Sequence, residues 1–187
     1  GVGHFVREPV PAVEHYRLVR ASPQTTMSGR QDAPSYLRPV SRVKVFERVP
    51  GATIRGQGPA NETVMASVQM RMTSRNETFT YTQEVRTDED GSFTMTVPYS
   101  TTGYETYGTD EGYTNLSVRA TGKYSVSTNL MAENNSTYVY SDQVHVTEGN
   151  VLGENASVVT VELERSPVNL TAGGSGNGSS VRSVERA

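Results

Sequence analysis

Residues 63–72 read TVMASVQMRM, a stretch in which apolar and polar side chains alternate. Residues 79–85, FTYTQEV, alternate in the same way. Successive side chains of a β-strand point to opposite faces, so this period of two predicts strands with one buried face. In the first stretch the apolar face consists of Val64, Ala66, Val68, Met70 and Met72.

An acidic turn follows the second of these stretches. Residues 87–91 read TDEDG and end in an Asp-Gly pair. Residues 92–97, SFTMTV, then alternate again, with Phe93, Met95 and Val97 on the inward face. Asp-Gly between two alternating runs is a strong hairpin signal. The sequence therefore predicts that residues 79–85 and 92–97 form a hairpin.

Shorter apolar stretches recur at intervals of about 8–12 residues, a spacing typical of sandwiches. They lie at residues 43–46, 52–55, 116–120, 124–126, 138–140, 144–146 and 158–163. No stretch shows a 3.6-residue apolar period with caps. The pattern predicts an all-β protein, an antiparallel β-sandwich of the transthyretin-like or immunoglobulin-like kind, with a partly irregular N-terminal segment.

The chain divides into three predicted regions. Residues 1–40 contain one short strand-like stretch followed by a Pro-rich polar piece, and we expect them to be the end of a preceding domain plus a linker. Residues 41–165 form the predicted sandwich. Residues 166–187 are rich in Gly and Ser, which predicts a disordered tail.

Composition limits the function classes. The 187 residues carry a net charge of −3 and include no cysteine. Disulfides and thiolate chemistry are therefore excluded, and the charge argues against a nucleic-acid binder. No apolar run approaches the roughly 20 residues that span a bilayer, and the N-terminus is too polar for a signal peptide. We expect a mature product or, more in keeping with its start, a fragment.

Eight of the ten asparagines begin an Asn-X-Ser/Thr triplet, the acceptor sequence for N-glycosylation. This excess favours a chain that carries glycans on surface loops outside the cytoplasm. Turns rich in Asn, Ser and Thr are the alternative explanation. The candidate acceptors are Asn61, Asn76, Asn115, Asn134, Asn135, Asn155, Asn169 and Asn177.

Other polar clusters are better explained by structure than by chemistry. The carboxylates of residues 88–90 could bind calcium, but their spacing does not make an EF-hand and a solvated turn is the simpler interpretation. Residues 110–112 form a second acidic turn. The three histidines, His4, His15 and His145, are far apart in the sequence and have no metal-ligand spacing. We expect no catalytic, cofactor-binding or metal-binding residue in this chain.

Four tyrosines crowd one predicted loop, residues 98–113: Tyr99, Tyr104, Tyr107 and Tyr113. Tyrosine offers an apolar ring with a polar tip, which suits stacking on sugars or contact with a protein. Packing of the loop against the edge of the sandwich is the alternative. The four tyrosines are the candidate contact residues.

A family resemblance rests on three segments. Residues 43–64 (VKVFERVPGATIRGQGPANETV) and residues 80–124, which include PYSTTGY and GYTNLSVRATG, resemble the C-terminal extracytoplasmic region of haloarchaeal oligosaccharyltransferases, the AglB family. Residues 14–22, EHYRLVRAS, resemble the last strand of the core domain that precedes this region in the family.

The resemblance implies a parent enzyme with many membrane-spanning helices. Such an enzyme moves a dolichol-linked glycan onto Asn of Asn-X-Ser/Thr and uses a divalent metal, Mn or Mg. Family members recognise the acceptor through a Trp-Trp-Asp motif, but this chain has no tryptophan, so no family site residue can be placed on it. The resemblance thus implies a noncatalytic peripheral β-domain on the extracytoplasmic face of the membrane.

The implied partners are the core and membrane domains of the same polypeptide, the acceptor protein and the lipid-linked oligosaccharide, with no nucleic acid. Two alternatives stay open on the sequence. One is a structural module of an N-glycosylated archaeal surface protein of the S-layer kind. The other is a carbohydrate-binding module that uses the tyrosine loop.

Overall fold

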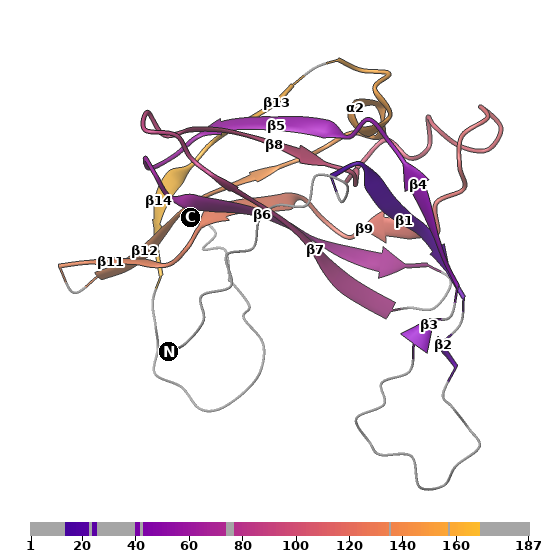
Figure 1. The fold of residues 1–187 in the computed structure, drawn as a ribbon, viewed down its shortest axis with the longest axis horizontal. Coiled ribbons are helices and arrows are strands. Elements are labelled where there is room, and N and C mark those ends of the chain that lie inside the picture. Colours follow the sequence, from indigo (N-terminus) through magenta and orange to yellow (C-terminus); the bar gives the residue numbers. More distant parts are fainter. Residues whose placement is uncertain are drawn as a thin grey trace, which may run out of the picture.

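The fold, taken from a computed structural model, is described for residues 14–22, 24–25, 40–41, 43–73, 77–134, 136–156 and 158–168. Strands dominate it (Figure 1), and one short helix interrupts them. The elements in chain order are β1 (Tyr16–Ala21), β2 (Gln24–Thr25), β3 (Val40–Ser41), β4 (Lys44–Arg48), β5 (Ala52–Gln57), β6 (Thr63–Met72), β7 (Glu77–Arg86), β8 (Ser92–Val97), β9 (Val118–Ala120), β10 (Tyr124–Thr128), β11 (Met131–Glu133), β12 (Ser136–Val144), α2 (Glu148–Leu152), β13 (Val159–Glu162) and β14 (Glu164–Pro167).

The longest hairpin is β6 with β7. Their antiparallel register runs without interruption from Thr63 opposite Arg86 to Met72 opposite Glu77. The predicted apolar face of β6 is confirmed, because Val64 and its alternate neighbours up to Met70 are buried and Met72 is half-buried. Period-two patterning therefore located both the strand and its inward face.

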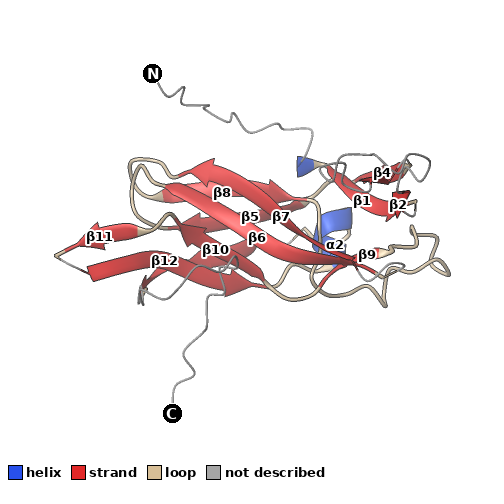
Figure 2. Cartoon of the chain, turned by 90° about the horizontal axis from the view of Figure 1, so that it is seen from below, coloured by secondary structure: helices blue, strands red, loops and turns tan. Residues whose placement is uncertain are grey.

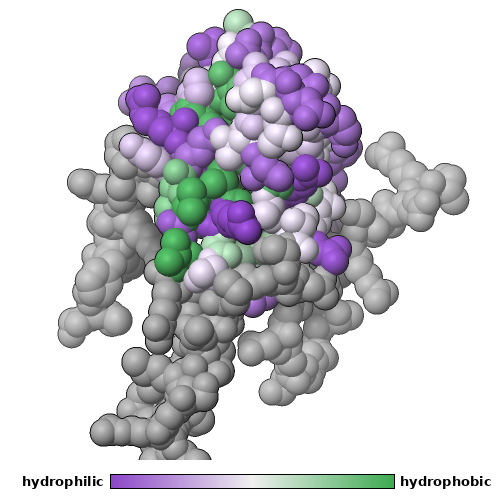
Figure 3. Space-filling view, turned by 90° about the vertical axis from the view of Figure 1, so that its right-hand side faces the viewer, coloured by the Kyte–Doolittle hydropathy of each residue, from purple (hydrophilic) through white to green (hydrophobic). Residues whose placement is uncertain are grey.

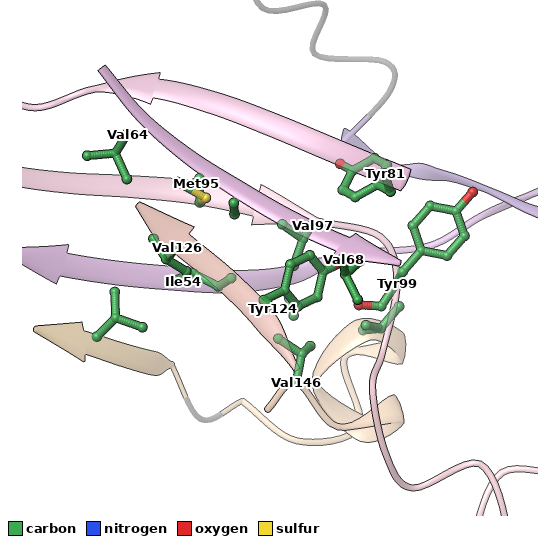
Figure 4. Close-up of a cluster of buried hydrophobic side chains, with 14 of the residues drawn as sticks. Ile54, Val64, Val68, Tyr81, Met95, Val97, Tyr99, Tyr124, Val126 and Val146 are labelled. Atoms are coloured by element: carbon green, nitrogen blue, oxygen red, sulfur yellow. The ribbon is translucent and has the colours of Figure 1, made fainter. Parts of the chain in front are cut away.

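Two sheets face each other across one core. The larger sheet orders its strands β11-β12-β10-β6-β7, with β9 beside β6 and β14 beside β12, and the smaller sheet is β13-β5-β8. Figure 1 shows the smaller sheet above the larger one. Ile54, Val97, Tyr124 and Val146 fill the space between them (Figure 4). The predicted all-β sandwich is confirmed, with one departure: β13 pairs with β5 in parallel.

The predicted hairpin across the Asp-Gly turn is wrong. The turn itself forms, because Gly91 has a φ of 82° and its N–H donates to the Asp88 carbonyl at 3.0 Å. However, β7 pairs with β6 and β8 pairs with β5, so the turn carries the chain from one sheet to the other. Alternating side chains bury one face of β7 and of β8 whether the two strands pair with each other or lie in different sheets. The sequence pattern therefore could not tell these two arrangements apart.

A separate two-stranded sheet joins β1 to β4, with Arg17 opposite Glu47 and Leu18 opposite Phe46. It lies at one end of the molecule, and the β11–β12 hairpin lies at the other (Figure 2). The domain boundary predicted between residues 40 and 41 falls between these paired strands and stays a prediction. At the C-terminal end, β14 extends two residues into the predicted tail, of which residues 169–187 lie outside the described part.

A short helix, α2, was not predicted. Thr147 caps it: the Thr147 hydroxyl accepts from the Asn150 N–H at 3.2 Å, and the Asn150 side chain accepts from the Thr147 N–H. Five residues are too few to display a 3.6-residue apolar period, although the cap residues carried a local signal. No helix in the described residues is long and apolar enough to span a membrane.

Candidate functional site

The tyrosine-rich loop leaves β8 and returns to β9 at the β1–β4 end of the molecule. Its first half is tied to the segment around α2: Thr101 N–H donates to the Val146 carbonyl at 2.7 Å, and Glu148 N–H donates to the Thr102 carbonyl at 2.8 Å. The second half contains the predicted acidic turn, in which Gly112 has a φ of 88° and donates to the Thr109 carbonyl at 3.1 Å. The loop therefore has a fixed base and a projecting turn.

Tyr99 belongs to the core. Its ring meets Tyr81 edge to face at 5.0 Å, and its hydroxyl accepts from the Leu18 N–H at 2.8 Å. Burial raises the pKa of the Tyr99 phenol. The residue fastens β1 to the sandwich, so its side chain is not available to a partner.

Tyr104 is also held within the fold. Its hydroxyl donates to the Ser100 carbonyl at 2.5 Å and accepts from the Ala120 N–H at 3.1 Å. The Arg119 guanidinium lies 4.9 Å from the centre of the Tyr104 ring, a cation–π distance. Burial raises the pKa of this phenol as well. Tyr104 thus forms a rigid wall at the base of the loop.

Tyr107 and Tyr113 lie further out. Their rings meet edge to face at 5.2 Å, and both are half-buried. The Tyr113 hydroxyl contacts Glu154 at 3.1 Å, and this hydrogen bond raises the pKa of the Tyr113 phenol. These two rings are the outermost of the predicted contact set, and their hydroxyls are less enclosed by the fold than those of Tyr99 and Tyr104.

A surface pocket opens between the loop and the strand that follows it. Its volume is about 140 Å³. Arg119 is the one charged residue that lines this pocket. Its Nε–H donates to the Leu116 carbonyl at 3.3 Å. The lining residues are Tyr104, Tyr107, Gly108, Thr109, Thr114, Asn115, Leu116 and Arg119. Hydroxyls, an amide and one cation thus surround an aromatic wall, a set of groups that can hydrogen-bond and stack.

A buried ion-pair network lies close to the loop base and was missed by sequence reasoning. Arg17 pairs with Glu148 at 2.7 Å and with Glu47 at 2.8 Å, and the Ser100 hydroxyl donates to the second Glu148 oxygen. Arg17 and Glu148 are almost completely buried. Buried charges persist when they are paired and hydrogen-bonded, and these carboxylates compensate one guanidinium. These four residues are far apart in the sequence, so no local sequence pattern could predict that they form a network.

The sequons differ in how the fold presents them. Asn61, Asn115, Asn134 and Asn155 are exposed, whereas Asn76, Asn135, Asn169 and Asn177 lie outside the described residues. In the Asn115 triplet the middle residue, Leu116, is buried. The Ser117 hydroxyl of that triplet donates to the Val19 carbonyl of β1 at 2.7 Å. The Asn115 sequon is therefore clamped at the two positions that follow the acceptor.

The remaining candidates stay apart. His15 contacts the Val49 carbonyl at 3.3 Å and His145 contacts the Thr101 hydroxyl at 3.1 Å, while His4 lies outside the described residues. The Asp90 carboxylate accepts from the Ser92 N–H, which lowers its pKa. In the described part of the chain, no three His, Asp or Glu side chains gather as they would to hold a metal ion.

The sequence profile of the family described as archaeal glycosylation protein B, long peripheral domain, matches residues 51–158. The chain belongs to this family. The AglB peripheral-domain match contains the tyrosine loop, the pocket and Glu148, whereas β1 and β4, with Arg17 and Glu47, precede it.

Known relatives of this peripheral domain are glycotransferases. The chain is 47% identical over 188 residues to the dolichyl-monophosphooligosaccharide–protein glycotransferase AglB of Haloferax volcanii, covering 91% of this chain and 18% of that protein. It is 39% identical over 67 residues to a dolichyl-phosphooligosaccharide–protein glycotransferase of Archaeoglobus fulgidus, covering 36% of this chain and 8% of that protein. The chain thus spans less than a fifth of the length of either relative.

Among solved structures, the peripheral domain is similar to part of the Archaeoglobus fulgidus oligosaccharyltransferase in complex with Zn and sulfate, with 23% identity and a TM-score of 0.49 over 67% of this chain and 13% of that one. The A. fulgidus AglB in complex with an inhibitory peptide and a dolichol-phosphate gives 23% identity and a TM-score of 0.48 over 67% and 12%.

Proposed function

We propose that this AglB peripheral domain is the extracytoplasmic, noncatalytic β-domain of a membrane oligosaccharyltransferase. The parent enzyme transfers a dolichol-linked glycan to Asn of Asn-X-Ser/Thr, with its divalent metal outside this chain. The observation that carries the proposal is 47% identity to a glycotransferase over 91% of the chain. It favours the enzyme over the alternative predicted from the sequence, a structural module of a glycosylated surface protein.

The noncatalytic role is supported by what the polar groups of the domain do. Arg17 is paired with both Glu47 and Glu148, and the Tyr104 hydroxyl is bonded on both sides within the fold. These groups bind one another at the base of the loop, so they are not free to bind a substrate. The domain packs on the core of the enzyme and tunes the access of acceptor protein, with the half-buried Tyr107 and Tyr113 as its contact residues.

The test compares the full-length membrane polypeptide with this chain alone. Both receive a lipid-linked glycan, an Asn-X-Thr peptide and Mn²⁺ or Mg²⁺. We expect glycopeptide from the full-length polypeptide and none from the chain. Metal-dependent transfer by the chain alone would refute the noncatalytic role, and an inactive full-length polypeptide would refute the enzyme assignment.

A further inference from the structure

One side chain of the surface pocket is also a candidate glycan acceptor. Asn115 lines the pocket and is exposed. Within the described part of the chain its side-chain amide makes no hydrogen bond, so the nitrogen that would carry a glycan is not used by the fold. Figure 3 looks at the end of the molecule where the tyrosine loop lies, and most of the described surface there is hydrophilic. A sugar joined to Asn115 would therefore begin at the wall of the pocket and continue into water.

The walls of the pocket suit one sugar ring. Tyr104 and Tyr107 supply aromatic surface, on which the C–H face of a sugar can stack, and Thr109 supplies a hydroxyl. Arg119 uses its Nε–H on the Leu116 carbonyl, and its two terminal nitrogens have no hydrogen-bond partner among the described residues. They are therefore able to donate to sugar hydroxyls. A volume of about 140 Å³ lies below the about 300–1,000 Å³ of sites for drug-sized ligands, so it admits a single ring.

The chain on both sides of Asn115 is fixed. On one side the Tyr113 N–H donates to the Gly108 carbonyl at 3.0 Å and the Thr114 hydroxyl donates to Glu47 at 2.6 Å. On the other side Leu116 is buried and the Ser117 N–H donates to the Val19 carbonyl at 3.1 Å. A site that is already ordered loses little conformational entropy when a group enters it, which favours occupation of the pocket.

We propose that the pocket holds the first sugar of a glycan carried by Asn115, and that this glycan braces the tyrosine loop. The proposal rests on the proposed function, which places the chain on the side of the membrane where glycans are attached. A pocket of this size binds a free sugar weakly, because association costs translational and rotational freedom. A sugar joined to Asn115 has already lost that freedom and stays beside the pocket at a high effective concentration.

The fold requires the glycan to be attached before the chain folds. Transfer breaks the bond between the anomeric carbon of the first sugar and the phosphate oxygen of the lipid carrier, which keeps the electron pair. The anomeric carbon then bonds to Nδ2 of Asn115, and the amide loses one proton. An acceptor site must reach the whole triplet, but in the folded chain Leu116 is buried and the Ser117 hydroxyl is bonded to β1. The sugar therefore enters the pocket as the pocket forms.

The first test measures occupancy. The full-length membrane polypeptide is purified from the cells that make it, digested and analysed by glycopeptide mass spectrometry. We expect a glycan on Asn115. A bare Asn115 in this polypeptide would overturn the proposal.

The second test measures the bracing of the loop by hydrogen–deuterium exchange. The amides of Gly112 and Tyr113 are bonded to the Thr109 and Gly108 carbonyls, so their exchange reports opening of the loop. Asn115→Gln removes the glycan without removing a hydrogen bond among the described residues. We expect these amides to exchange about threefold to tenfold faster in Asn115→Gln, a change of the size that aromatic contacts give. Equal exchange in the two polypeptides would contradict bracing by the glycan.

A double-mutant comparison locates the sugar. Tyr107→Ala removes one wall of the pocket and also the ring contact with Tyr113, so it speeds exchange by itself. With this wall absent, we expect Asn115→Gln to cause little further change. The matched control is Glu105→Ala, an exposed position of the same loop that does not line the pocket, and there the full effect of Asn115→Gln should remain. An undiminished glycan effect in Tyr107→Ala would place the sugar outside the pocket and overturn the proposal.

The outcomes separate this proposal from the function on which it rests. A polypeptide that transfers glycan to an Asn-X-Thr peptide but has a bare Asn115 refutes the glycan site alone. A polypeptide with a glycan on Asn115 and glycan-dependent protection of the loop, yet without transfer activity, refutes the enzyme assignment and leaves the glycan site in place.

Discussion

The buried guanidinium of Arg17 is one of the groups that hold β1 to the sandwich. Replacing Glu148 by Gln keeps the side-chain shape and the Ser100 contact but removes one of the two carboxylates that compensate this charge. Glu47 remains to balance the Arg17 charge, so the expected loss is that of a hydrogen bond to a charged group, about 1.5–3 kcal/mol. Urea unfolding of the purified chain measures it.

The matched control is Glu133→Gln. Glu133 pairs with Arg165 at 3.3 Å, but both side chains are about half exposed. A surface pair of this kind contributes at most about 1 kcal/mol. Similar losses for the two variants would show that Arg17 is not compensated by Glu148 in the way the structure indicates.

Two buried tyrosine hydroxyls form a natural comparison. Tyr124 donates to the Tyr99 carbonyl at 2.9 Å, whereas the buried Tyr81 hydroxyl has no partner among the described residues. Tyr124→Phe leaves a buried carbonyl unsatisfied and should cost about 1–2 kcal/mol. Tyr81→Phe removes a hydroxyl that loses its hydrogen bonds to water on folding and gains none in the fold, so the free energy of unfolding should stay level or rise. The reverse order in thermal melts would contradict this assignment.

Alkaline pH should weaken the fold through the same residues. Burial raises the pKa of Tyr99 and, further, that of Tyr124, while an unfolded tyrosine ionises near pH 10. Above about pH 10 the folded state keeps protons that the unfolded state has lost, so the free energy of unfolding falls as pH rises. Below that pH these groups contribute no slope. Urea titrations across this range should show a shallower decline in Tyr124→Phe than in the wild type.

At the scale of elements, the turn at Gly91 links the two sheets. Gly91 has a φ of 82°, and an added Cβ would collide with the Gly58 carbonyl oxygen. Gly112 has a φ of 88°, but open space surrounds the position of its Cβ. Gly112→Ala should therefore lose about 1 kcal/mol from backbone strain alone, and Gly91→Ala should lose more because a backbone must also shift. Equal midpoints in urea would rule out the tight approach of the Gly58 and Gly91 backbones.

Alternation predicted the elements better than their partners. It placed β6, β7 and β8 and their inward faces, because burial of one sheet face imposes a period of two whatever the neighbouring strand is. It could not predict that β8 pairs with β5, because the inward side chains Phe93 and Met95 would be buried in either sheet. The tyrosine loop was located correctly, yet only tertiary contacts separate the anchored Tyr99 and Tyr104 from the outer Tyr107 and Tyr113.

At the scale of the whole molecule, folding should control modification of Asn115. Glycan transfer joins the glycan to the Asn amide nitrogen and requires the triplet to fit an acceptor site. In the folded chain Leu116 is buried and the Ser117 hydroxyl is bonded to β1. We expect an active oligosaccharyltransferase to modify Asn115 in urea-unfolded or truncated chain and to leave it unmodified in folded chain.

Glycopeptide mass spectrometry provides the readout, with the exposed Asn61 triplet followed in the same samples as an internal comparison. Equal occupancy of Asn115 in folded and unfolded chain would show that the contact with β1 does not protect this sequon.

Arg17 and Glu148 are far apart in the sequence, so their ion pair can form only late in the synthesis of the chain. A ribosome adds roughly 5–20 residues per second, so the 131 positions that separate these partners (148 − 17) take on the order of ten seconds to appear. Throughout that interval Arg17 lacks Glu148, and for most of it β1 also lacks the hydroxyl of Ser117. In a chain made from its N-terminus, β1 is therefore among the last strands to be secured, and Asn115 is made before Glu148 can pair with Arg17.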